Sequence, residues 1–309
     1  MMKIALICLA AWATLCPGAS LTQGQNDLAR RILASTLATD YSLASKQADT
    51  LSASKRDAGS FFRNMILLSR FDDLGDTLDL LRSQAFLDTV KIGDPFWENL
   101  RLFQLGYVKT ELKQTVSGVL TTRKAAKGFA TMGTLEARAF YAIYDYYMQG
   151  TTAWVPFKTD NRPRLLQTLD SAAKGNNFFW PLFATSLAWM HFDRKDYAAG
   201  LRITEFALVQ YPRHPVYTQM KADMLFRLGR TKEAIGIYES SVATYAKRAP
   251  NSVRWWSGAG NLLRMYSVMG DSVQVKKWKQ CFSGPRFQKV RPWMPPSLMK
   301  ALENQNLLP

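Results

Sequence analysis

Few residues in this chain of 309 amino acids have side chains and spacings suited to chemistry. Its two histidines, His191 and His214, have no partner at the spacing of a zinc site or of a nucleophile–histidine–acid triad. No glycine loop ending in Gly-Lys-Ser or Gly-Lys-Thr is present to cradle a phosphate. The acids Asp72, Asp73 and Asp76 are most simply an exposed helix start, where the helix dipole favours negative charge. We therefore expect no enzyme, no metal and no cofactor.

The N-terminus has the pattern of a secretory signal. A positive start precedes the apolar stretch Ile4–Leu15, which is too short to span a bilayer and is followed by the small residues Gly18–Ser20. We expect residues 1–20 to be a cleaved signal peptide and the protein to be secreted or periplasmic. An uncleaved anchor and a lipoprotein modified at Cys16 stay open, although Leu15 stands where lipidation requires a small residue.

Removal of that segment leaves Cys281 as the single cysteine, because Cys8 and Cys16 lie within it. One thiol cannot form an internal disulfide. Neither histidine is near Cys281 in the sequence to activate it. We therefore expect Cys281 to be a small apolar core residue near a helix end.

Positive charge is concentrated in the second half of the chain. Of the formal net charge of +16, residues 1–150 contribute +3 and residues 151–309 contribute +13. No acid lies between Asp271 and Glu303. The basic residues that could dock on an anionic surface are Lys276, Lys277, Lys279, Arg286, Lys289 and Arg291. Three interpretations stay open: a solvated basic surface, a contact with anionic envelope lipid or polymer or an acidic protein, and a contact with nucleic acid, which an exported protein seldom meets.

Apolar residues recur at helical spacing through the first half of the chain. We expect Leu43, Leu78 and Leu81 to face inward from their helices, and Pro95 to open a helix at its first turn. The one extended candidate is the short segment Ala153–Phe157.

The organisation is clearest after residue 163. The predicted helices there are 165–173, 178–192, 197–211, 215–228, 231–248, 252–269 and 272–282. We expect Gly175 to end the first of them in a left-handed conformation. The tail from Pro285 is rich in proline and is expected to add one short helix from Ser297.

Two polar turns that lie 34 residues apart begin the same pattern. Lys195 and Gly229 each start a turn, and a small residue follows five positions later, at Gly200 and Ala234. An apolar helix face comes next in both. The following turn, at Gly270, comes after 41 residues. A helical hairpin repeated at this period makes a solenoid, and solenoids usually bind rather than catalyse.

Small residues stand where the paired helices would come closest. They are Ala188 and Gly200 in one pair, and Ala222 and Ala234 in the next. The larger apolar residues expected to fill the next layer are Leu187, Ile203, Leu225 and Tyr238.

This pattern resembles the tetratricopeptide repeat (TPR), a helical hairpin with a 34-residue period and small residues at two inner positions. The resemblance is good over residues 181–248 and weaker over 252–283, where Val275 replaces the usual small residue. More loosely, residues 134–283 are similar to a group of exported bacterial TPR proteins. The resemblance implies an all-α fold, a right-handed superhelix of helix–turn–helix repeats whose N-terminal part consists of degenerate hairpins.

The expected organisation is a signal peptide (1–20), N-terminal helical hairpins (21–150), a linker loop (151–162), TPR-like repeats (163–284) and a basic, proline-rich cap (285–309). In a TPR superhelix the first helix of each pair lines the concave face. The resemblance places there, as partner-binding residues, Trp189, Phe192, Asp223, Phe226, Arg227 and Arg264. Packing of Trp189 and Phe226 between hairpins is the alternative. The chaperone-type carboxylate clamp is not expected, because Thr185 and Trp189 replace its Lys and Asn.

We therefore expect an exported, non-catalytic scaffold that binds a protein or peptide partner through its concave face. The alternative is an envelope-associated protein that docks on anionic lipid or cell-wall polymer through its basic C-terminal residues.

Overall fold

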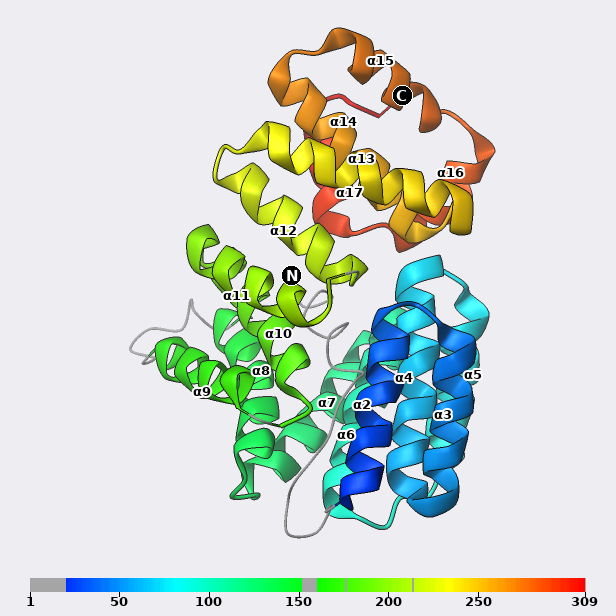
Figure 1. Cartoon of the computed structure of the whole chain (residues 1–309), viewed down its shortest axis with the longest axis vertical. Helices are drawn as coiled ribbons and strands as arrows, with labels where there is room; N and C mark the ends of the chain where they lie inside the picture. Colours follow the sequence, from blue (N-terminus) through cyan, green and yellow to red (C-terminus); the bar gives the residue numbers. More distant parts are fainter. Residues whose placement is uncertain (1–20, 152–159, 176, 213, 309) are drawn as a thin grey trace. The chain divides into compact units, whose positions relative to one another are not determined.

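A computed structural model describes residues 21–151, 160–175, 177–212 and 214–308. Within these ranges the regular structure is entirely helical, with sixteen α-helices and one short 3-10 helix (Figure 1). The all-α prediction is therefore confirmed. The signal peptide with its lipidation candidate Cys16, the extended candidate Ala153–Phe157 and most of the linker loop lie outside the described residues.

The chain divides into two compact units. Unit 1 contains the residues up to Arg70 together with Thr77–Arg194, and unit 2 contains Phe71–Asp76 together with Lys195–Pro309. The helices that begin in unit 1 are α2 (Gln23–Leu37), α3 (Tyr41–Ser54), α4 (Arg56–Leu74), α5 (Thr77–Thr89), α6 (Pro95–Glu111), α7 (Thr115–Ala130), α8 (Leu135–Thr151), α9 (Arg162–Lys174) and α10 (Trp180–Asp193). The last residues of α4 belong to unit 2.

The helices of unit 2 are α11 (Tyr197–Gln210), α12 (Pro215–Arg227), α13 (Thr231–Arg248), α14 (Val253–Met269), α15 (Ser272–Cys281), α16 (Pro285–Val290), the 3-10 helix η2 (Arg291–Trp293) and α17 (Pro296–Asn304). Most helix contacts in each unit join helices that are consecutive in the sequence, as α6 with α7 in unit 1 and α12 with α13 in unit 2, which is the pattern of a solenoid. The division into units does not test where the repeats begin, so the ranges 21–150 and 163–284 stay predictions.

The turns between paired helices share one backbone conformation in both units. A residue with positive φ stands directly before the N-cap of the second helix, at Thr39, Lys113, Lys195, Gly229 and Gly270. In at least four of these turns the next amide donates to a carbonyl five residues back, as from Asp40 to Ser35 and from Asp271 to Tyr266. This is the C-cap that closes a helix with a left-handed residue. The repeated turn extends the hairpin pattern into the N-terminal part.

Unit 1 has a very close helix crossing between α6 and α7. Gly106 on α6 faces Thr122 on α7, and Gly118 on α7 faces Thr110 on α6. A Cβ atom on Gly106 would lie 2.1 Å from the Thr122 hydroxyl oxygen and 3.0 Å from the carbonyl oxygen of Gly118. The two glycines therefore allow the helix backbones to touch.

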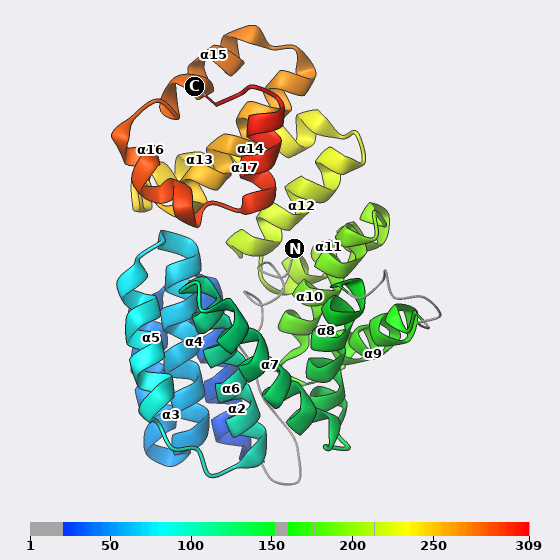
Figure 2. The same ribbon diagram turned by 180° about the vertical axis from the view of Figure 1, so that it is seen from behind.

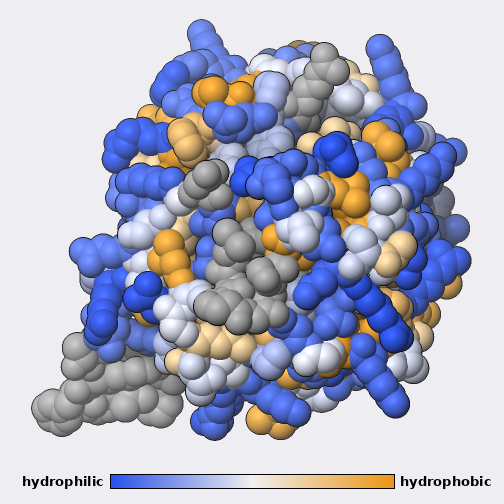
Figure 3. Space-filling model, turned by 60° about the horizontal axis from the view of Figure 1, so that its bottom comes forward, coloured by the Kyte–Doolittle hydropathy of each residue, from blue (hydrophilic) through white to orange (hydrophobic). Residues whose placement is uncertain are grey.

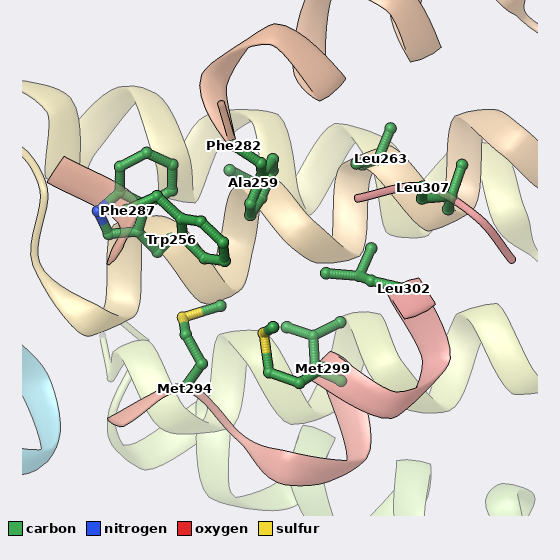
Figure 4. Packing of buried hydrophobic residues seen from close by; sticks show 10 residues of the cluster. Trp256, Ala259, Leu263, Phe282, Phe287, Met294, Met299, Leu302 and Leu307 are labelled. Atoms are coloured by element: carbon green, nitrogen blue, oxygen red, sulfur yellow. The ribbon is translucent and has the colours of Figure 1, made fainter. Parts of the chain in front are cut away.

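In unit 2, the predicted small pair Ala222 and Ala234 is fully buried between α12 and α13, beside Leu225 and Tyr238. A second core lies at the C-terminal end, where α16 and α17 pack against α14 (Figure 2). Figure 4 shows Trp256 of α14 beside Phe282 and Phe287, with Met294 and Met299 below. The tail adds two short α-helices rather than the one expected, and the second begins at Pro296.

Three inward-facing predictions are wrong. Leu43, Leu78 and Leu81 are about half exposed, at 45%, 53% and 52%. On α5 the buried face instead carries Leu80 and Leu87 together with Asp79, whose carboxylate pairs with Arg70 and is thereby accommodated in the interior. Because α5 has leucines on two faces, apolar spacing alone selected the wrong one.

Two further local predictions need correction. Gly175 ends α9 with φ of −69°, so its conformation is extended and not left-handed. Cys281 is the last residue of α15, as expected, but it is only partly buried and is not a core residue. Burial still raises the pKa of its thiol.

Candidate functional site

A polar network joins three helices of unit 2. The Tyr238 hydroxyl on α13 donates to Asp223 Oδ1 on α12 at 2.7 Å, and Asn261 Nδ2 on α14 donates to Tyr238 Oη at 3.0 Å. Arg264 Nη1 then donates to Asn261 Oδ1 at 3.3 Å. The Arg264 guanidinium lies over the ring of Phe226, 5.6 Å from its centroid. We call this set, together with Arg227, the α12–α14 face.

Helical spacing brings these side chains together. Asp223, Phe226 and Arg227 stand at positions i, i+3 and i+4 of α12, and Asn261 and Arg264 stand three apart on α14. Arg227 is exposed, whereas Asp223, Phe226 and Arg264 are half-buried. A partner can therefore reach the face, although most of its polar atoms are fixed by neighbours.

Burial controls the charges on this face. It raises the pKa of Asp223 to about 6, although the Tyr238 hydrogen bond and the charge of Arg264 act in the opposite direction. Burial, and next the positive charge of Arg227, lower the pKa of Arg264. The pKa of Tyr238 is well above its usual value, because the hydroxyl is buried and beside Asp223. The guanidinium groups of Arg227 and Arg264 are thus both near a single carboxyl, that of Asp223, which is poorly solvated.

Of the six residues expected to bind a partner, the structure brings Asp223, Phe226 and Arg264 together, with the charge of Arg227 acting on Arg264. Trp189 and Phe192 lie on α10 in unit 1, where both are half-buried and form an edge-to-face pair with ring centroids 5.4 Å apart. The two groups belong to different units. Their assignment to a concave binding face stays a prediction.

Sequence reasoning missed two members of the α12–α14 face. Tyr238 was assigned to the core, which is right for its ring, but its hydroxyl also connects Asp223 to Asn261. Asn261 was not singled out. Its position three residues before Arg264 on a predicted helix was the available signal, since such residues share one face.

The predicted basic docking residues fall into two kinds. Lys276, Lys277, Arg286 and Lys289 are exposed. Lys279 Nζ donates to the carbonyl of Asn306 at 3.0 Å, and Arg291 forms a 3.1 Å ion pair with Glu303. Lys279 and Arg291 therefore contact the C-terminal segment of the chain. An open hollow of about 250 Å³ beside this ion pair is lined by Phe282, Phe287, Gln288, Arg291, Glu303, Asn306 and Leu308.

Exposed apolar side chains accompany the exposed lysines of α15. Val268 and Met269 end α14 and Val273 lies in the first turn of α15, and they are 59%, 45% and 74% exposed. Lys276 and Lys277 follow within four residues. Elsewhere on the surface, the face shown in Figure 3 has apolar residues in small groups among polar ones.

A second charged cluster corrects the prediction for Asp73, whereas Asp76 is exposed and directly precedes α5, as expected of a helix start. Asp73 is 1% exposed and lies at the end of α4, not at an exposed helix start. Within unit 2 its carboxylate accepts hydrogen bonds from the Tyr245 hydroxyl at 2.5 Å and from Arg248 at 2.9 Å. Arg254 lies 3.5 Å away. The cluster holds the segment Phe71–Asp76 in unit 2 and is structural.

The geometry gives His214 a structural role. His214 is the N-cap of α12, where its Nδ1 accepts a hydrogen bond from the Tyr217 amide at 3.1 Å. Burial lowers the pKa of His214 to about 3, so the ring is neutral. His191 lies half-buried on α10. Among the described residues no group of three or more His, Cys, Asp or Glu side chains is placed to hold a metal, and none of the helices is long and apolar enough to cross a bilayer.

The consecutive helix pairs, the repeated left-handed turn and the buried alanine pair define a TPR-like helical solenoid. Among solved structures the chain is similar to a Rap protein complexed with Competence and Sporulation Factor, at 12% identity and a TM-score of 0.51, with 93% of this chain and 88% of that chain covered. It is also aligned with a tetratricopeptide repeat protein from Parabacteroides merdae, at 13% identity and a TM-score of 0.41, over 92% and 100% of the two chains. No protein-family model and no curated protein matches the sequence. The likeness to the Rap structure agrees with the helix packing and confirms the predicted helical-solenoid fold.

Proposed function

We propose that this protein is an exported, non-catalytic scaffold that binds a protein or peptide partner. The observation that carries the proposal is the α12–α14 face, where Phe226 and the two arginines Arg227 and Arg264 meet at a partly accessible surface. Aromatic and arginine side chains are the usual anchors of protein interfaces. The similar Rap structure was solved as a complex with Competence and Sporulation Factor, which supports a binding role for this fold.

The test is crosslinking capture from an envelope extract with the purified mature chain as bait. We expect Arg227→Ala and Trp189→Ala each to reduce capture of the same partner band by about tenfold or more, which corresponds to about 1.4 kcal/mol. Arg202→Ala, an exposed arginine on α11, is the matched control and should capture as the wild type does. Equal capture by all four proteins, with unchanged circular dichroism, would count against the proposal.

Export is part of the proposal and rests on the N-terminal pattern of residues 1–20. Expression of the full chain in a bacterial host, followed by fractionation and N-terminal sequencing, tests it. We expect a shortened chain in the periplasmic or secreted fraction. A full-length chain in the cytosol would refute export.

A second candidate is docking on an anionic envelope surface. It is favoured by the exposed Val268, Met269 and Val273 beside Lys276 and Lys277, because apolar insertion and cationic attraction together bind proteins to anionic bilayers. Binding to phosphatidylglycerol vesicles should be lost at high salt and in a Lys276→Glu, Lys277→Glu double variant. Lys232→Glu with Lys247→Glu, two exposed lysines of α13, is the charge-matched control. Binding that is insensitive to salt and to the variant would rule out this candidate.

A further inference from the structure

The guanidinium of Arg264 has unmet hydrogen-bonding capacity. It carries five N–H donors in a planar fork, and one of them donates to Asn261 Oδ1 at 3.3 Å. Its Nε is buried and has no hydrogen-bond partner. Arg264 makes no ion pair with any residue of the described chain, since the nearby carboxyl of Asp223 is hydrogen-bonded to Tyr238. A buried donor without a partner is costly, so such a group indicates a missing acceptor.

The charges around Arg264 favour an anion as that acceptor. Arg227 is near enough that its charge disfavours the charged form of Arg264. The carboxyl on the same face, Asp223, has its pKa raised to about 6 by burial, and even when ionised it balances only one of the two guanidinium charges. A bound anion would offset the repulsion between the two guanidinium groups and accept the free N–H donors.

The orientation of Arg264 is already fixed. Its plane lies over the Phe226 ring, and Asn261, anchored through Tyr238, holds one edge. A fork fixed in this way loses little rotamer freedom on binding, and its two parallel donors match the two oxygens of a carboxylate. The apolar ring beneath also lowers the hydration that competes with such a pair.

We propose that Arg264, with Arg227 beside it, binds a carboxylate of the peptide partner, supplied by an aspartate or glutamate side chain or by a free C-terminus. The inference rests on the proposed scaffold function and names the chemistry of the partner. In this site Arg264 donates hydrogen bonds to the carboxylate oxygens, and Phe226 and Asn261 position Arg264. Arg227 adds positive charge at the exposed edge of the site.

The experiment uses a positional-scanning library of fluorescent dodecapeptides, with every pool made both as the free acid and as the C-terminal amide. Binding to the mature full-length chain is measured by fluorescence anisotropy. For the wild type we expect either the Asp and Glu pools to bind 10- to 100-fold more tightly than the Asn and Gln pools, or the free acids to exceed the amides by that factor. The first result identifies a side-chain carboxylate and the second identifies a C-terminus.

Three variants test the assignment. Arg264→Gln should abolish the preference for acids. Arg264→Lys, which keeps the charge but not the fork, should retain only part of it. Arg202→Gln is the control with the same loss of charge and should keep the full preference. If circular dichroism shows that Arg264→Gln is unfolded, Arg264→Lys and Arg227→Gln replace it in the test. A preference for acids that is not reduced in either of these variants would then overturn the inference.

The outcomes separate the inference from the function beneath it. Wild-type binding without any preference for acids, or an equal preference in wild type and Arg264→Gln, overturns the carboxylate site and leaves the scaffold function intact. Failure of every pool to bind the wild type overturns the proposed peptide-binding function together with the inference.

Discussion

Replacing Asp73 with alanine should destabilise unit 2 far more than the sequence suggests. In the structure its side chain is 2% exposed and contacts Tyr245, Arg248 and Arg254. Because Asp73 lies at the C-terminal end of α4, where the helix dipole opposes a negative charge, the two arginines are required to balance it.

The size of the effect follows from these contacts. Two hydrogen bonds to the ionised carboxylate, from Tyr245 and Arg248, contribute about 1.5–3 kcal/mol each. Arg254, 14% exposed, would in addition lose its nearby counter-charge in a poorly solvated place. Removal of one partner from a buried ionic cluster typically costs about 3–5 kcal/mol, and we expect Asp73→Ala to fall in that range.

Urea denaturation followed by circular dichroism measures this loss. Asp49→Ala is the control, because Asp49 is also a helical aspartate paired with an arginine, Arg63 at 2.8 Å, but both of these side chains are about half exposed. Its loss should stay below about 1 kcal/mol. Two variants of equal stability would refute the reasoning that burial, rather than the mere presence of an ion pair, sets the energy.

Three other predictions concern pH and packing. Because the pKa of His214 is about 3 in the folded protein, the free energy of unfolding should fall by about 1.4 kcal/mol per pH unit as pH falls below about 6.5. The variant His214→Asn, which keeps an N-cap, should remove this slope in urea titrations. Asp223, with a pKa of about 6, acts oppositely: stability falls as pH rises from about 4 to 6, and Asp223→Asn should lack this fall. Gly106→Ala should destabilise the protein by about 1–3 kcal/mol, because the added methyl group collides with Thr122. Gly236→Ala, where the methyl group enters open space, should stabilise it by about 0.5–1 kcal/mol, and thermal denaturation measures both changes. Unchanged pH slopes, or equal melting shifts for the two glycines, would contradict them.

Local signals predicted the helices well. Thr231–Arg248 has the predicted bounds, and Ser252 caps α14 as the start of the predicted segment. The 34-residue spacing of Lys195 and Gly229 marks the same left-handed turn in the structure. Such features depend on residues within one or two turns of helix, and the sequence displays those residues next to each other.

The candidate site was predicted only in part, because it depends on contacts between residues that are distant in the sequence. Arg264 and Phe226 were selected by their place in the repeat, but their contact depends on how α12 and α14 pack. Nothing in the local sequence indicates that Tyr238 would bond Asp223, because the partners lie on different helices. Asp73 was misread because its partners are more than 170 residues away, and neighbouring acids alone look like a solvated helix end.

An all-α chain of helical hairpins, with small residues at helix contacts and a strongly basic second half, can be recognised from the amino-acid order. Those properties follow from periodicity, turn chemistry and composition. Only the packing of the helices shows which polar groups are buried and which groups they contact, and hence that Asp73 is structural while Arg264 has unused donors. Burial and charge balance arise from atoms brought together by folding, so they have no signature at a single position in the chain.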